Sequence, residues 1–415
     1  MAITLEREPV SQVYVNKNKW LDLLFLGQTP QDYFRSLFTK WNAIFAFILA
    51  VGLPLTYIRF TEGMGAVSNL TNDNPWGFWI GVDVAAGVAL AAGGFTVGAA
   101  VFIFGKEKYH LVLRPAVLTG MLGYAFVVVG LCFDLGRPWR LPYPMFVSHG
   151  VTSVMFEVGW CVALYLTVQV LEFLPVGFEA AGWRKLRHWA VRITIGVTIL
   201  GITLSTLHQS ALGSLFLIAP SKVHPLWYSS YLPIYFFISA VIAGLTMVIF
   251  ESTLSHKFFH EQINPANNAD MHEITMGLGK AASVVLFVYF CLKWLGVAHQ
   301  HAFGYLDSNF GHWFLVEMFG FVLLPCFLIG WAVRENLVKW VRIGAGIAVL
   351  GVVVNRVNVA IVAMNWNGPE TYIPSWKEVW ISLTVITLGV LTFRFIVNRA
   401  PVLRPHPDFI GEPDH

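Results

Sequence analysis

Ten apolar stretches, each about 20 residues or longer, dominate this sequence and constrain what it can fold into. A helix needs about 20 apolar residues to cross the ~30 Å hydrocarbon core of a bilayer. The segments between the stretches are too short to form a soluble domain of useful size. We therefore predict an all-α, polytopic membrane helix bundle with about ten transmembrane helices. The stretches are 41–60, 77–104, 111–132, 150–173, 189–210, 231–253, 277–297, 311–333, 340–362 and 377–398.

The composition supports this class. Charged residues make up 12% of the chain, against about 25% in an ordinary soluble domain. A formal net charge of +3 without any basic tract argues against a nucleic-acid partner. The first forty residues are polar and mixed in charge, so we expect no cleavable signal peptide. The first apolar stretch would then act as its own insertion signal.

Lys and Arg residues predict the orientation of the helices, because short cytoplasmic loops carry an excess of both. The side that holds both chain ends carries Arg7, Lys17, Lys19, Arg35, Lys40, Lys106, Lys108, Arg184, Lys185, Arg187, Lys257, Arg334, Lys339, Arg342, Arg399 and Arg404. The opposite side carries Arg59, Arg137, Arg140, Lys222 and Lys377. We therefore predict a cytoplasmic N-terminal tail at 1–40, a transmembrane domain at 41–398 and a cytoplasmic C-terminal tail at 399–415.

The four cysteines show no cofactor-binding pattern. Cys132, Cys161, Cys291 and Cys326 each stand alone within an apolar stretch, without the CxxC, CxxCH or iron–sulfur spacings. Isolated cysteines in such stretches are typical of small buried hydrophobic residues. We therefore expect any haem or iron–sulfur electron carrier on a partner subunit, and none on this chain.

Ionisable residues gather near the predicted outer ends of several helices. Such groups are costly inside a membrane and usually face a bundle interior or a wet cavity. They are Asp83, Asp134, Arg137, His149, Glu157, His208 and Arg356, and Gln209 and Ser210 follow His208 directly. Reducing a quinone takes two electrons and two protons, and carboxylates and imidazoles are suited to supply the protons. We interpret the group as a candidate quinone site.

Two spacings within this group are informative, and each has a structural alternative. Asp134 and Arg137 are three residues apart, so on a helical turn they would face each other, in a site or as an interfacial salt bridge. His149 and Glu157 are eight residues apart and would share a helix face if the helix already includes His149. A single histidine would be typical of a structural role, so the interpretation depends on the whole group.

Three more residues lie near the predicted outer membrane surface. His224 and Trp227 fit either the rim of the site or an aromatic anchor at the membrane interface. Lys293 lies near the outer end of the seventh stretch, and we expect its side chain to extend to water.

Another small group lies at the predicted cytoplasmic ends. His110 and Arg114 stand one turn apart at the start of the third stretch, and Glu251 ends the sixth. They would begin a proton path toward the outer site, or they are helix-end charges that reach water.

Several segments resemble one family of membrane proteins. The segment NPWGFWIGVDVAAGVALAAGGF (74–95) resembles the second-helix motif of the NrfD/PsrC-like integral membrane subunits. The similarity continues through YHLVLRPAVLTGMLGY (109–124), DLGRPW (134–139), LHQSALGSL (207–215), KVHPLW (222–227), IFE (249–251) and PSWKEVWIS (374–382). The pattern looks like the ten-helix HybB type found with nickel–iron hydrogenases, and it is similar to the HmcC and QrcD types of multihaem-cytochrome complexes.

The resemblance implies a haem-free subunit of the bacterial cytoplasmic membrane that binds menaquinone or ubiquinone near its outer face. Its partner there would be a ferredoxin-like iron–sulfur subunit, with a hydrogenase or a multihaem cytochrome c. By motif, the quinone-binding residues would be Asp83, His149, Glu157, His208, Gln209 and Ser210. The rim would include Asp134, Arg137, His224, Trp227 and Arg356, and the proton path His110, Arg114 and Glu251. Proton translocation and the direction of electron flow stay open.

Two other functions remain possible at this point. A dihaem cytochrome b would need histidine pairs at matching depth, for which His149 and His208 are one candidate pair without a convincing second. A secondary transporter often shows inverted repeats and helices broken at mid-membrane, which the sequence does not suggest. The tail before Trp41 is longer than the hydrogenase-associated branch leads us to expect, and it would allow additional cytoplasmic redox subunits.

Overall fold

The computed structural model describes residues 25, 26, 28–263 and 268–409. Each of the ten apolar stretches forms a helical segment that is long and apolar enough to cross a membrane, which confirms the predicted fold class. The described residues form no β-strand, although Val223 and Met364 make an isolated antiparallel bridge. Residues 1–24 of the predicted N-terminal tail lie outside the described part of the chain.

The bounds of the helices follow the apolar stretches closely. Six spans are single helices: α3 (Lys40–Glu62), α6 (His110–Asp134), α8 (Val154–Ala180), α10 (Leu232–Phe258), α11 (Asn268–His299) and α15 (Trp376–Val397). Four are composite: η3 (Trp79–Ala86) with α4 (Gly87–Leu90), α5 (Gly93–Gly98) and η4 (Ala99–Ile103); α9 (Arg184–Leu215) with η7 (Phe216–Ile218); α12 (Asn309–Leu315) with η11 (Val316–Leu323) and α13 (Leu324–Arg334); α14 (Val338–Val357) with η12 (Asn358–Val362). The short elements are α2 (Pro30–Ser36), η2 (Met64–Ala66), η5 (Glu107–Tyr109), η6 (Pro138–Arg140), α7 (Tyr143–Phe146), η8 (His260–Gln262), η10 (Ala302–Asp307) and η13 (Pro407–Phe409).

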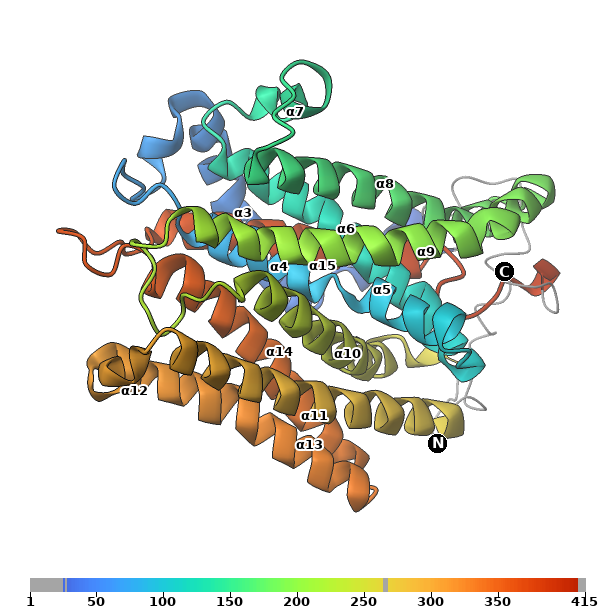
Figure 1. Ribbon diagram of the computed structural model, residues 1–415. Helices are drawn as coiled ribbons and strands as arrows, with labels where there is room; N and C mark the ends of the chain where they lie inside the picture. Colours follow the sequence, from blue (N-terminus) through green and yellow to red (C-terminus); the bar gives the residue numbers. More distant parts are fainter. Residues whose placement is uncertain (1–24, 27, 264–267, 410–415) are drawn as a thin grey trace.

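The spans form two groups of four helices that pack side by side (Figure 1). The first group contains the composite span η3–η4 with α6, α8 and α9, and the second contains α10, α11, α12–α13 and α14. The central α10 contacts both groups, since it packs on α9 and α5 as well as on α11 and α14. The remaining spans, α3 and α15, pack on each other, and α15 also lies against α6.

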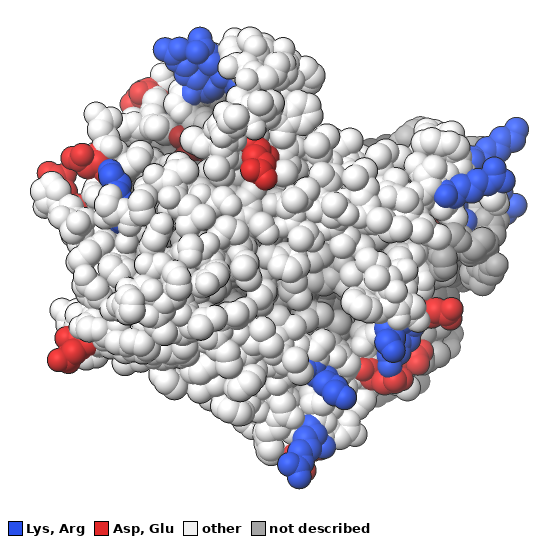
Figure 2. All heavy atoms as spheres, viewed as in Figure 1, with Lys and Arg blue, Asp and Glu red and all other residues white. Residues whose placement is uncertain are grey.

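The bundle has two ends with different connections. One end, here called the α7 end, carries α7 and η10, and the other, the tail end, carries the C-terminal segment 398–409 (Figure 1). Acidic and basic side chains lie mainly at these two ends on the face shown in Figure 2, and the belt between them is largely uncharged. This distribution is the one that a bilayer requires.

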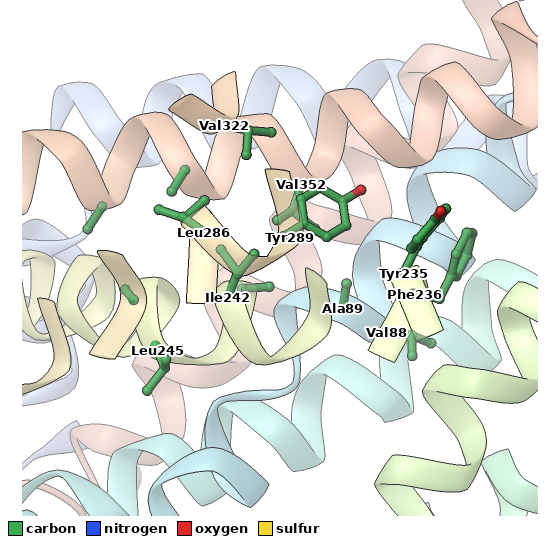
Figure 3. Packing of buried hydrophobic residues seen from close by; sticks show 14 of the residues in the cluster. Val88, Ala89, Tyr235, Phe236, Ile242, Leu245, Leu286, Tyr289, Val322 and Val352 are labelled. Carbon is green, nitrogen blue, oxygen red and sulfur yellow. The ribbon is translucent and has the colours of Figure 1, made fainter. Parts of the chain in front are cut away.

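The largest buried hydrophobic cluster joins the two groups. Val88 and Ala89 of the first group lie in the same cluster as Phe236 and Tyr289 of the second (Figure 3). The backbones of α10 and the second span approach closely at Gly244, since a Cβ at this residue would lie 2.7 Å from the carbonyl oxygen of Ala92. Small residues let helix backbones approach in this way inside a membrane.

Three of the composite spans contain π-helical turns. They are η3 and η4 in the second span, η11 in the eighth and η12 in the ninth. Such turns are rare and frequently occur at functional sites. Buried polar residues lie in three of them: Asp83 in η3, Glu317 in η11 and Asn358 in η12.

The C-terminal segment packs against the tail end of the first group. Glu179 of α8, which is fully buried, accepts hydrogen bonds from Arg114 (3.0 and 3.2 Å), from Arg187 (3.2 Å) and from the backbone N–H of His406 (2.7 Å). Phe409 is buried beneath the guanidinium of Arg187, 5.2 Å from its ring. The described part of the predicted C-terminal tail is therefore an integral part of the bundle.

Candidate functional site

Asp83 is a buried carboxylate of the first group. It lies one turn inside η3, near the α7 end, and its Oδ2 accepts a hydrogen bond from the Ser382 hydroxyl of α15 at 2.7 Å. Gly130 of α6 provides the space, since a Cβ there would lie 2.8 Å from the Asp83 Cβ. No described residue donates a hydrogen bond to Oδ1, which is also buried. Asp83 therefore keeps one oxygen for another partner.

His208 is fully buried in α9 and lies deeper in the bundle than Asp83, since its neighbour Gln209 bonds to Val88, five residues further along the second span. Its Nδ1 lies 2.9 Å from the Tyr124 hydroxyl of α6. When that hydroxyl donates, the proton of the neutral imidazole is on Nε2. Among the described residues, Nε2 finds no hydrogen-bond partner. The side chain is thus held at one nitrogen and has a donor at the other.

Gln209 links His208 to the composite second span. Its amide Nε2 donates to the carbonyl oxygen of Val88 at 3.0 Å. Val88 is five residues after Asp83 on the same span. The Gln209 Oε1 is buried and accepts no hydrogen bond from the part of the chain that the structure describes. Asp83 lies on the second span and Gln209 bonds to the same span, and Asp83, His208 and Gln209 each have an unpaired buried polar atom.

Further polar side chains continue from His208 toward the tail end. The Tyr124 ring packs edge-to-face on Tyr165 at 4.5 Å, and the Tyr165 hydroxyl accepts a hydrogen bond from Gln169 one turn along α8. Glu172 follows one turn later and lines a cleft at the tail end together with His110, Arg114 and Thr198. This polar column, from His208 through Tyr124, Tyr165 and Gln169 to Glu172, runs inside the first group. His110 and Arg114 lie at its tail-end cleft.

 His110 and Arg114 are two of the three residues at which we predicted that a proton path begins.

Glu251, the third residue expected on that path, lies at a different opening. It lines a second tail-end cleft between α6 and α10, together with Pro115 and His256. Leu403 of the C-terminal segment lines the same cleft. The structure therefore places His110 and Arg114 at one cleft and Glu251 at another, both at the tail end.

Asp134 has a neighbour other than the one its spacing suggested. Helix α6 ends at Asp134, so Arg137 lies beyond the helix, is exposed and makes no ion pair with Asp134 in the described structure. Arg59 of α3, which is buried, donates instead to the carbonyl oxygens of Phe133 and Leu135, both at 2.7 Å. The expected Asp134–Arg137 contact is therefore wrong, because the helical spacing does not continue past residue 134.

His149 and Glu157 lie apart from the buried residues. Helix α8 begins at Val154, so His149 belongs to the preceding loop, and the predicted shared helix face does not form. Both side chains are exposed at the α7 end, where the His149 ring contacts Phe156 at 6.4 Å. Ser210 is half-buried in α9 beside Gln209. The structure thus buries Asp83, His208 and Gln209 within the first group, and leaves His149 and Glu157 at the surface.

His224, Trp227 and Arg356 are deeply buried in or beside the second group. Trp227 donates through Nε1 to Glu317 at 2.7 Å, a contact that differs from an aromatic anchor facing lipid. Lys293 is 3% exposed, so its predicted extension to water is wrong. Sequence reasoning missed Glu317 altogether, although a single carboxylate within the apolar stretch 311–333 was a signal.

His224 lies in the loop between η7 and α10, outside the membrane-spanning helices. Burial lowers the pKa of its imidazole to about 4, so it is neutral at pH 7. Its Nδ1 accepts a hydrogen bond from the backbone N–H of Leu226 at 3.2 Å, and its ring packs on Phe310 and Trp366, both at 4.7 Å. These contacts indicate a structural role for His224 in holding the loop at the α7 end.

Comparison with known proteins identifies the family of this chain. The model of the family described as "Polysulphide reductase, NrfD" matches residues 66–366. This chain belongs to the NrfD family. The match begins before Asp83 and ends after Arg356, so it covers both four-helix groups.

Individual relatives of this NrfD-family chain include membrane subunits of redox complexes. A protein of Nitratidesulfovibrio vulgaris, named only "Protein", is 51% identical over 90% of this chain and 97% of its own length. The "Probable Ni/Fe-hydrogenase 2 b-type cytochrome subunit" of Escherichia coli is 30% identical over 92% of this chain and 96% of its own. The "Menaquinone reductase, integral membrane subunit" of N. vulgaris is 27% identical over 88% and 92%. The chain is thus similar over nearly its full length to NrfD-family membrane subunits of oxidoreductases.

Proposed function

We propose that this NrfD-family chain is the quinone-binding membrane subunit of a respiratory oxidoreductase complex. It would bind menaquinone or ubiquinone beside Asp83 and His208 and exchange electrons with an iron–sulfur partner at the α7 end. That partner would be a ferredoxin-like subunit joined to a hydrogenase or a multihaem cytochrome c. In this proposal the complex lies in the bacterial cytoplasmic membrane with its α7 end facing outward.

The observation that carries the proposal is a set of three unpaired buried polar atoms in the first four-helix group. Asp83 Oδ1, His208 Nε2 and Gln209 Oε1 are all buried, and no described residue hydrogen-bonds them. Buried polar groups normally have partners, so these three atoms suit a ligand that carries polar oxygens on an apolar body. A quinone has this character.

The chemistry of these side chains fits quinone reduction or quinol oxidation. A bound quinone supplies two-electron redox chemistry, and its oxygens gain or lose protons with the electrons. His208 would donate through Nε2 to one of those oxygens, and the Tyr124 hydroxyl would hold the imidazole in place at Nδ1. Asp83, fixed by Ser382, would receive or return a proton at Oδ1.

The polar column supplies a route for those protons. It starts at the tail-end cleft with Glu172 and passes Gln169, Tyr165 and Tyr124 before it reaches His208. Hydroxyl and carboxyl groups relay protons, whereas the Gln169 amide would hold the hydroxyl beside it. We propose that protons enter by this column and that the complex translocates them when the tail end faces the cytoplasm.

A haem-binding role is the second candidate, because the E. coli relative is named a b-type cytochrome subunit. The geometry of the first group favours a haem-free chain. His149 lies in an exposed loop, whereas His208 is fully buried and engaged by Tyr124 at Nδ1. These two residues therefore do not present paired imidazoles on facing helices. A reduced-minus-oxidised spectrum of the purified chain tests this point, since a Soret band would establish the haem.

The proposal is tested by locating a quinone analogue in the complex purified with its partners. Analogue density beside Asp83 and His208 supports it, and density confined to the cleft of His110 would refute the site.

In parallel, His208→Ala should lower the rate of quinone-dependent electron transfer by about tenfold or more while the complex still assembles. His188→Gln is the matched control, because His188 is exposed on the same helix, and it should leave the rate unchanged.

A further inference from the structure

The second four-helix group contains a buried charged cluster of its own. Glu317, 1% exposed in η11, accepts hydrogen bonds from Trp227 at 2.7 Å and Asn355 at 2.6 Å. A third hydrogen bond comes from the Asn358 side-chain amide. The carboxylate is therefore held by three neutral donors, and no cation forms an ion pair with it among the described residues.

Two cations belong to the same cluster, because Arg356 donates to Asn355 at 3.2 Å, which donates to Glu317, and Lys293 lies over the ring of Phe314, three residues before Glu317. Arg356 is 1% exposed and donates to the Ser239 hydroxyl at 2.9 Å and to the carbonyl oxygen of Phe236 at 3.1 Å. The Lys293 ammonium lies over the rings of Tyr235 at 5.3 Å and Phe314 at 5.5 Å. A cluster with two bases and one acid has one base more than its charge balance needs.

Several donors in this cluster lack an acceptor. Arg356 Nε and the Tyr289 hydroxyl are buried and bond to no residue that the structure describes. The Lys293 ammonium likewise donates no hydrogen bond to any described residue. Figure 3 shows Tyr289 and Tyr235 in the packing between the helices of this group. Unpaired buried donors of this kind are satisfied by internal water, which also conducts protons.

We propose that Lys293 and Glu317 form a second proton-exchanging site, in the second four-helix group and separate from the quinone pocket. The transferred proton leaves the Lys293 ammonium, passes through water beside the Tyr289 hydroxyl and binds the Glu317 carboxylate. Lysine is then a neutral amine and glutamate a neutral acid, and the reverse transfer restores both charges. Arg356 keeps its charge throughout, and its hydrogen bonds to Asn355, Ser239 and Phe236 hold the helices of the cluster in place.

The structure also connects this site to Asp83. Asn358, which donates to Glu317, begins the π-turn η12, and Ala360 of the same turn packs against Gly81 of η3. A Cβ at Gly81 would lie 3.3 Å from the Ala360 Cβ, so the two π-turns are in close contact. Asp83 is two residues from Gly81. A change in charge at Asp83 would therefore act on the Glu317 cluster through packed backbone.

The inference rests on the proposed function, because quinone chemistry at Asp83 would drive the exchange. The test uses the whole complex in proteoliposomes with a water-soluble menaquinone analogue, and it measures electron transfer and proton movement together. Lys293→Met, Glu317→Gln and Tyr289→Phe should each keep the electron-transfer rate within about twofold and lower the protons moved per electron pair by about half or more. Lys280→Met, an exposed lysine on the same helix, is the matched control and should change neither.

An infrared difference spectrum adds a readout that a structural role would not move. Quinone reduction should produce a carboxylic-acid C=O band of Glu317 in the wild type, separate from any band of Asp83, and Glu317→Gln should remove the Glu317 band. Unchanged proton movement in Tyr289→Phe and Lys293→Met, with no carboxylic-acid band lost in Glu317→Gln, would overturn the inference. Wild-type electron transfer without net proton movement would also overturn it, together with the proposed proton translocation, and leave the proposed quinone binding and electron transfer intact. A complex without quinone-dependent electron transfer would refute both.

Discussion

At the scale of single residues, burial and hydrogen bonding separate the members of the predicted site. Asp83, His208 and Gln209 are buried with unpaired atoms, whereas His149 and Glu157 are exposed at the α7 end. Ionisable groups inside a membrane persist where they have a partner or a function. The buried three are therefore the residues on which the quinone hypothesis depends.

The Tyr124 hydroxyl should matter because it positions His208. Tyr124→Phe removes the group 2.9 Å from His208 Nδ1 and leaves the packing of the ring on Tyr165. We expect the maximal rate of quinone reaction in the complex to fall by about tenfold, with a smaller change in KM, because the imidazole loses its fixed orientation. Tyr57→Phe, at an exposed tyrosine of α3, is the control. An unchanged rate in Tyr124→Phe would show that His208 does not need this contact.

Residue-level predictions from the sequence succeeded or failed according to helix geometry. The position of Asp83 in an apolar stretch indicated a buried carboxylate, and it is buried. Lys293 was expected at the surface because it is near a helix end, but its helix turns it toward Tyr235 and Phe314. The predicted contact between Asp134 and Arg137 is wrong for a related reason, since α6 ends before Arg137. Rotation about a helix axis and the residue at which a helix ends both depend on tertiary packing, which one sequence does not reveal.

At the scale of elements, the apolar stretches predicted all ten spans, because the bilayer demands the same length of each. The π-turns were not predicted. A π-turn changes which backbone groups pair, and the side-chain pattern of an apolar helix hardly records this change. Two of the three π-turns with buried polar residues, η3 and η12, pack on each other, so the least predictable elements adjoin the candidate sites.

The contact between α10 and the second span should be sensitive to volume. Gly244→Ala places a methyl group 2.7 Å from the carbonyl oxygen of Ala92 and 2.7 Å from Thr96. We expect a loss of about 1–3 kcal/mol, seen as a lower melting temperature of the purified subunit in detergent. Gly346→Ala on α14 is the control, since nothing lies within 4 Å of its added Cβ, and it should be neutral or slightly stabilising. Equal melting temperatures for both variants would contradict the close approach.

The C-terminal segment should depend on one buried carboxylate. Glu179→Ala removes the shared acceptor of Arg114, Arg187 and the His406 backbone N–H. Breaking a buried charged cluster costs about 3–5 kcal/mol, so we expect the segment to detach from the tail end. Limited proteolysis of the subunit in detergent checks this, with faster cleavage after residue 398 in the variant. Glu335→Ala, at an exposed position, is the control and should leave cleavage unchanged.

At the scale of the whole molecule, the two ends of the bundle determine what each candidate site can exchange with its surroundings. The tail end holds both clefts and the start of the polar column, whereas the α7 end holds Asp83 and the exposed pair His149 and Glu157. If the Lys and Arg distribution orients the chain as predicted, protons enter from the cytoplasm and electrons pass on the opposite side. The orientation is therefore the point on which the direction of proton movement depends.

Cysteine labelling in intact cells tests this orientation directly. Val147 beside α7 is exposed, so Val147→Cys should react with a membrane-impermeant maleimide added from outside after the outer membrane is permeabilised. A cysteine in place of Lys185, which is exposed near the start of α9 at the tail end, should react only after the inner membrane is opened. The unsubstituted chain, with Cys132, Cys161, Cys291 and Cys326 within the spans, gives the background. The opposite pattern of labelling would place the tail-end clefts outside. The polar column would then release protons where the proposal has them enter, and the partner that exchanges electrons beside Asp83 would be cytoplasmic.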